Sequence, residues 1–254
     1  MFSAKTMEYF EASRLKIERA KQHINDLRSR ILAFADSDFY TLSIDKDTKT
    51  GNYGLKIEVR RSLPNDFALI IGDAAHNLKS ALDVLANEVV FLRLGRYDKH
   101  TRFPIRDTRN DLVIAVKGAL ISQASKEVAN FIVDVVKAYK GGNDALWALH
   151  DLNILDKHRL LLPVMQVTSI VDFCAEDDRG NKCINATLVV TRNRTVTVFE
   201  SLGNIRITNK GKTIPLVPFD KGLPMEGQAV VPSLIQLTEL VSGIVEGVAK
   251  VFLG

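Results

Sequence analysis

The chain has 254 residues, of which 46% are hydrophobic and 25% are charged, as is ordinary for a soluble globular protein. Its 34 basic and 30 acidic residues give a net charge of +4, which is compatible with nucleic acid but does not require it. No apolar run approaches the length that spans a bilayer, and the N-terminus soon becomes charged. We therefore expect a cytoplasmic protein that contacts no membrane.

Apolar residues spaced by three and four predict helices over 5–35, 66–93, 111–121, 123–139, 144–162 and 232–254. Alternating residues predict a hairpin over 39–62 and further strands within 164–217. The expected fold is α+β, a bundle of about five to six helices with an antiparallel β-sheet. We expect a single domain over 1–254. Its helical core would be 1–163 and 232–254, and its mainly β segment 164–217 would pack on that core.

Polar side chains follow one face of each of two predicted helices, advancing by three or four residues. The helix over 66–93 carries Asp73, His76, Ser80, Asp83 and Asn87 in this way. The helix over 144–162 has apolar residues all round and still carries His150, Asn153, Asp156 and His158, which is typical of a buried helix. Because buried polar groups need partners, we expect the two polar rows to face each other.

The same two helices carry a longer motif. Gly72–Asp83 reads GDAAHNLKSALD, Phe103–Ile105 reads FPI, and Leu149–Arg159 reads LHDLNILDKHR. This resembles a family of uncharacterised bacterial hypothetical proteins with the pattern GDxxHNLRSALDxL, FPI and LHxLNxxDKHR, over about residues 65–163. The family has no assigned function, so the resemblance implies no mechanism. Lys79 departs from the family's arginine and lacks the planar guanidinium.

A basic loop follows the helix over 66–93 and contains Arg96, Lys99, His100, Arg102 and Arg106. We expect Phe103-Pro104-Ile105 to hold this loop on the core. Six residues separate Arg93 from His100, which resembles the Arg-x(4–6)-His signature of the HEPN superfamily. That resemblance implies a distant HEPN-like helical domain, and many such domains are ribonucleases.

The first hypothesis for the polar rows is a metal-independent ribonuclease or RNA-binding protein. His150 and His158 would act as base and acid, since histidine titrates near neutral pH. The other catalytic candidates are Asp156, His76 and Asp83, and the candidates for holding the RNA are Lys157, Arg159, Asn153 and Lys79.

Two alternatives stay open, so the sequence does not decide whether the protein is an enzyme. The polar rows could be a structural network in a non-enzymatic binding or scaffolding protein. They could also be a metal-dependent hydrolase site in a helical bundle, with His76, Asp83, His150 and His158 as ligands. Against that, His150 and His158 are eight residues apart and point about 80° away from each other.

The chain contains no metal or cofactor signature, so we expect no cofactor and assign no metal ligand. A homodimer through the first or last long helix is an alternative to pairing of these helices within the chain. Cys174 and Cys183 flank a predicted turn that would set them opposite each other, and we expect reduced thiols. Gly243 and Gly247 predict close packing of the last helix.

Overall fold

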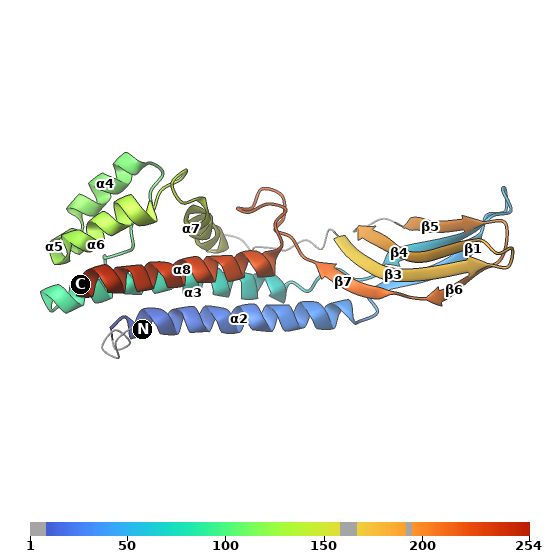
Figure 1. The fold of residues 1–254 in the computed structure, drawn as a ribbon, viewed down its shortest axis with the longest axis horizontal. Coiled ribbons are helices and arrows are strands. Elements are labelled where there is room, and N and C mark those ends of the chain that lie inside the picture. The colour runs from blue at the N-terminus through green and yellow to red at the C-terminus, as the bar shows by residue number, and fades with distance from the viewer. Residues whose placement is uncertain (1–8, 158–166, 192–194) are drawn as a thin grey trace.

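A computed structural model describes residues 9–157, 167–191 and 195–254 (Figure 1). The long helices α2 (Glu11–Ala35), α3 (Asp66–Leu94) and α8 (Val230–Leu253) lie side by side. Shorter helices pack on α3 and α8, and they are α5 (Leu120–Ala124), α6 (Lys126–Asn130), the π-helix η1 (Phe131–Val136) and α7 (Asp144–Asp156). The helix α4 (Arg109–Gly118) packs on α5 and η1. Because α2 and α8 contact each other and α3, the first and last helices pair within the chain.

The strands form antiparallel sheets beyond one end of the long helices (Figure 1). One sheet has the order β1 (Tyr40–Lys46), β2 (Tyr53–Val59), β5 (Val196–Ser201), so the predicted N-terminal hairpin is confirmed and gains a strand from the C-terminal half. The other has the order β4 (Lys182–Thr191), β3 (Val167–Asp177), β6 (Ile205–Asn209), and β7 (Lys212–Leu216) also pairs with β3. The predicted α+β class is confirmed.

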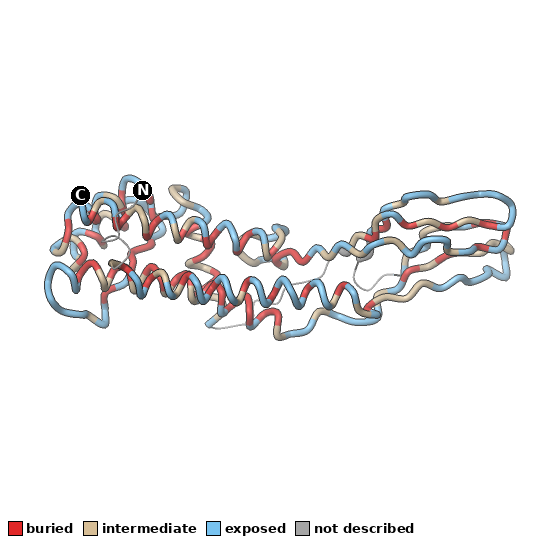
Figure 2. Tube along the Cα trace, turned by 60° about the horizontal axis from the view of Figure 1, so that its bottom comes forward, coloured by how far each residue is buried: buried red, intermediate tan, exposed pale blue. Residues whose placement is uncertain are grey.

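Buried residues form two clusters, one in the helical part and one in the β part, and Figure 2 shows buried residues in both parts. The helical cluster includes Ile17, Ile24 and Leu27 of α2, whose spacing of three and seven keeps them on one face of the helix. The β cluster includes Leu55, Ile57 and Phe173. Each part therefore buries apolar surface of its own. The strand β7 contacts α2 and leads the chain from the sheets back to α8.

Three predicted helices differ from the structure. The helix expected over 111–121 is divided at Ala119, whose backbone is extended, into α4 and α5. The helix expected over 123–139 changes to a π-helix at Phe131, and Lys137 ends it with a positive φ of 54°. The wider turn rotates the following residues, so Val135 is exposed although it lies three residues after the buried Ile132. The helix expected to run to residue 162 ends at Asp156 in α7, and residues 158–166 lie outside the described part of the chain.

Apolar residues lie all round α7, but the expectation that the whole helix is buried was wrong, because Ile154 is exposed and the buried residues lie on one side. Within the described ranges, no helix is long and apolar enough to cross a membrane.

The predicted opposition of Cys174 and Cys183 was wrong by one residue. Cys183 pairs with Ala175, and a register irregularity separates that pair from the pairing of Phe173 with Ala186. Both thiols are free, and the backbone N–H of Asn185 donates to Cys174 Sγ. Neighbouring residues of a strand point to opposite faces of the sheet, so this register does not favour a disulfide between them.

Candidate functional site

The two predicted polar rows face each other along the contact of α3 with α7, which confirms the packing inferred from the sequence. The helices run in opposite directions, because Gly72 approaches Asp156 while His76 approaches Asn153. This contact, which we call the seam, consists of the polar face of α3, the facing side of α7 and the part of loop 95–108 that lies against them.

His76 joins the two helices at the middle of the seam. Its Nδ1 lies 3.2 Å from Asn153 Oδ1, and its Nε2 lies 3.3 Å from Ser80 Oγ. A neutral tautomer with the proton on Nδ1 satisfies both contacts, donating to the amide oxygen and accepting from the hydroxyl. His76 and Asn153, predicted as catalytic and substrate-binding, are thus partners of each other.

Asp156 lies over Gly72 at one end of the seam. A Cβ added to Gly72 would be 1.9 Å from Asp156 Oδ1, so only glycine lets the carboxylate approach α3 this closely. Burial raises the pKa of Asp156, and the negative charge of Asp73 raises it further, whereas His76 opposes the shift. The Asp156 carboxylate therefore lies against the second and third turns of α3, next to His76, in a place that disfavours its charged form.

Lys79 and Asp83 form the most buried ion pair of the seam. Lys79 Nζ donates to Asp83 Oδ1 at 2.6 Å, and the two side chains are 8% and 24% exposed. The same oxygen accepts the backbone N–H of Phe103 at 2.9 Å. Burial lowers the pKa of Lys79, and the nearby Asp83 carboxylate opposes this effect. Asp83 therefore holds both a buried ammonium group and the returning loop.

His150 lies one α7 turn before Asn153, half-buried beside Trp147, with ring centroids 5.7 Å apart. Its Nδ1 is buried and has no hydrogen-bond partner among the described residues. Burial lowers the pKa of His150, and the positive charge of Lys79 lowers it further. His150 is therefore driven towards its neutral form, in which one ring nitrogen is free to accept a proton.

Exposed cations lie along the edge of the seam. Arg102 and Lys157 act on Lys79 as like charges, and Arg106 acts in the same way on His150. Loop 95–108 positions both arginines, because Phe103, Pro104 and Ile105 are buried, as predicted. In addition, the backbone N–H of Arg106 donates to Ala138 O at 3.1 Å. The sequence identified these arginines only as part of a basic loop, although the buried FPI motif beside them was the signal that the loop returns to the helices.

Some predicted residues are not placed in the seam. His158 and Arg159 lie outside the described residues. Lys157, at the C-terminal end of α7, is exposed. Arg93 instead binds the end of α8, where its guanidinium donates to Phe252 O at 2.9 Å and lies 4.4 Å from the ring centroid. The structure gives Arg93 a packing role, and its HEPN-like pairing with His100 remains a prediction.

Within the described residues, no group of three or more His, Cys, Asp or Glu side chains is arranged to hold a metal ion. The metal hypothesis proposed His76, Asp83 and His150 as ligands. His76 and Asp83 are two turns apart on α3, His150 is on α7, and His76 is hydrogen-bonded to Asn153. The described part of the seam therefore offers acid–base and cationic groups in preference to a ligand cluster.

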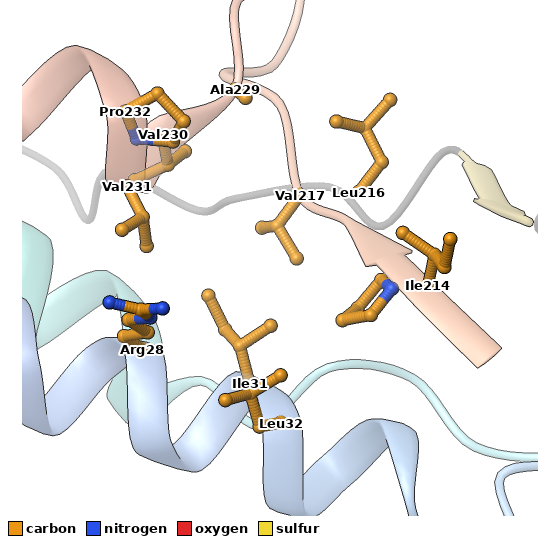
Figure 3. Close-up of a pocket in the computed structure, with 11 residues that line it drawn as sticks. Arg28, Ile31, Leu32, Ile214, Leu216, Val217, Ala229, Val230, Val231 and Pro232 are labelled. Carbon is orange, nitrogen blue, oxygen red and sulfur yellow. The ribbon is translucent and has the colours of Figure 1, made fainter. Parts of the chain in front are cut away.

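An apolar cavity of about 280 Å³ lies away from the seam, between α2, β7 and the start of α8 (Figure 3). Its lining is aliphatic except for Arg28, which reaches its edge beside Val231. The cavity contains no acid, base or nucleophile, so its size alone does not make it the better candidate for catalysis.

Comparison with protein-family models, with curated proteins and with solved structures gives no match. The resemblance to the bacterial family and to HEPN domains therefore remains a prediction from the motifs, and function must be argued from the seam itself.

Proposed function

We propose that the chain is an RNA-binding protein and that the α3–α7 seam gives it metal-independent ribonuclease activity. The observation that carries the proposal is His150, half-buried in the seam near Lys79, with a pKa that burial and the Lys79 charge lower. Its buried Nδ1 has no described partner, so Nε2 is the ring nitrogen that would reach a substrate. A histidine that is neutral near pH 7 is prepared to accept a proton as a general base. The positive charges around it favour a phosphate at the same place.

In the proposed reaction His150 takes the proton from a ribose 2′-hydroxyl, and the 2′-oxygen forms a bond to the adjacent phosphorus. The bond from phosphorus to the 5′-oxygen breaks, and that oxygen leaves with the electron pair and takes a proton. The sequence predicts His158, outside the described residues, as the donor of this proton. Arg102 and Lys157 would stabilise the negative charge that grows on the phosphate oxygens. The products are a 2′,3′-cyclic phosphate and a 5′-hydroxyl.

Support for the phosphate site comes from charge. Among the described residues, Arg102, Arg106 and Lys157 form no ion pair with a carboxylate, while Lys79 is paired with Asp83. Three exposed cations therefore lie along the seam, Arg106 near His150 and Arg102 and Lys157 near Lys79, and they are available to a polyanion. The buried ammonium group of Lys79 adds its positive charge.

The test is incubation of the purified chain with mixed RNA in EDTA, comparing the wild type with His150→Asn. His23→Asn on α2 is the matched control, because His23 is also partly exposed but lies outside the seam. We expect cleavage in EDTA with 5′-hydroxyl products, lost by a factor of about 100 or more in His150→Asn and kept in the control. Cleavage that needs a metal, or that survives His150→Asn, would contradict the mechanism.

One observation favours a second candidate, a non-enzymatic binding or scaffolding protein. The contacts of His76 with Asn153 and Ser80, and of Asp83 with Lys79 and Phe103, form a network that holds loop 95–108 and α7 on α3 without any substrate. If this is the whole role of the seam, His76→Ala will lower the melting temperature while the protein shows no turnover of RNA under any condition.

A further inference from the structure

An aromatic pair stands at the C-terminal end of α3, on the side of the helix that carries the seam. The rings of Phe91 and Tyr97 are stacked, with centroids 4.3 Å apart and planes inclined by 9°. Tyr97 is 68% exposed, and Phe91 is 38% exposed. The outer face of Tyr97 is thus a flat apolar surface in water, supported from behind by a second ring.

The position of this pair is fixed by the helix end and by loop 95–108. Gly95 ends α3 with a φ of 70°, and its N–H donates to Phe91 O at 2.8 Å. Asn87 then holds the loop on the helix, because its Oδ1 accepts from Asp98 N at 3.3 Å and its Nδ2 donates to Thr101 O at 3.0 Å. The loop therefore turns back at Tyr97 and runs along α3 towards Asp83.

Phe91, Asn87 and Asp83 are four residues apart in sequence, so they share one face of α3. From Phe91 to Lys79 the helix rises about 18 Å, at about 1.5 Å per residue. The exposed cations Arg96, Lys99 and Arg102 lie in the loop that covers this distance, and among the described residues they form no ion pair. One face of α3 thus joins a stacking surface to the seam along a loop with three exposed cations and one carboxylate, Asp98, which accepts a hydrogen bond from Thr101.

We propose that Tyr97 is a stacking platform for a base of single-stranded RNA, whose backbone follows Arg96, Lys99 and Arg102 towards His150. This inference rests on the proposed function and adds to it the form of the substrate, which is single-stranded because the faces of a base inside a duplex are covered by the neighbouring base pairs. Aromatic stacking together with a cationic track is how proteins bind single strands without reading their sequence. The platform is therefore expected to accept any base.

The test is fluorescence anisotropy of the full chain with a labelled oligomer of 2′-O-methyluridine, which has bases and phosphates but cannot be cleaved. An oligomer of the same length that lacks bases is the matched ligand. We expect Tyr97→Ala and Tyr97→Leu to bind the uridine oligomer about 5- to 150-fold more weakly than the wild type, and Tyr97→Phe to bind it nearly as well. The oligomer without bases should bind all four proteins equally.

Tyr97→Leu keeps apolar contact with Phe91, so a fold defect in the alanine variant would not prevent the test. Ile184→Ala in β4 removes a side chain that is similarly exposed, at 65%, in the β part of the molecule and should change neither affinity. If the wild type binds but Tyr97→Leu binds equally well, or loses affinity for both oligomers alike, the platform is refuted and the proposed function stands. If the wild type binds neither oligomer, the RNA-binding function and the platform are both refuted.

Discussion

Removal of the Asp83 carboxylate is expected to destabilise the seam more than removal of its lysine partner. In Asp83→Ala, the Lys79 ammonium, with a side chain only 8% exposed, loses its counter-charge, and the N–H of Phe103 loses its acceptor. Breaking a buried ion pair from one side costs about 3–5 kcal/mol, and an unsatisfied backbone N–H contributes to the same loss. We expect the free energy of unfolding to fall by about 4 kcal/mol.

Lys79→Met should cost far less, about 0–1 kcal/mol, because methionine fills a similar apolar space. In this variant the Asp83 carboxylate still accepts the N–H of Phe103, and water can reach it because Asp83 is 24% exposed. The loss in Asp83→Ala should also shrink as the pH rises towards 10.5. Burial lowers the pKa of Lys79 from that value, so the folded state releases its proton before the unfolded chain does.

Urea unfolding followed by circular dichroism measures both variants and the double variant. The double variant Lys79→Met/Asp83→Ala should be more stable than Asp83→Ala alone, since no charge is left without a partner. Equal losses in the two single variants, or a larger loss for Lys79→Met, would refute the view that a buried ammonium group depends on Asp83.

Three other measurements test particular contacts. The pKa of His150 is lowered from 6.5, so the unfolded chain binds its proton more readily; stability should fall as the pH drops below that value, and less so in His150→Phe. Gly247→Ala should lower the melting temperature, because its Cβ would lie 2.3 Å from the Phe131 ring. Gly243→Ala has nothing within 4 Å of its Cβ and should raise the free energy of unfolding by about 0.5–1 kcal/mol. Equal effects of the two substitutions would contradict this packing. Hydrogen bonds from Ser201 and Asn181 lower the pKa of Asp177 to about 2, so stability should decline as the pH falls from 3.8 through 2. An NMR titration of the Asp177 carboxyl group with a midpoint near 3.8 would be inconsistent with those hydrogen bonds.

The sequence was sufficient to predict the seam because its polar residues keep the spacing of one helix face. His76 and Asn153 could be brought together from periodicity and from the need of buried polar groups for partners. The α+β class and the hairpin over 39–62 were likewise predictable, since strands and helices have different apolar periods.

Other features depend on contacts that periodicity does not contain. Lys79 was expected to face a substrate, but it lies at the edge of the polar face and is buried against Asp83. The π-helix over Phe131–Val136 rotates the chain by part of a turn, which a spacing of three and four residues cannot show. The irregular register of β3 shifts its pairing by one residue, which an alternating pattern cannot show. The same limit applies to Gly243, which was expected to pack closely although only Gly247 contacts a neighbour, Phe131.

The most direct test of the seam as an RNA site is an NMR titration of the histidine imidazole signals with the uncleavable uridine oligomer in EDTA. We expect the His150 signal to shift on binding and its pKa to rise, because a bound phosphate favours the protonated ring. His23 on α2 is the internal control and should keep its signal. If the oligomer binds while His150 keeps both its signal and its pKa, the phosphate does not lie in the seam, and the ribonuclease mechanism is contradicted.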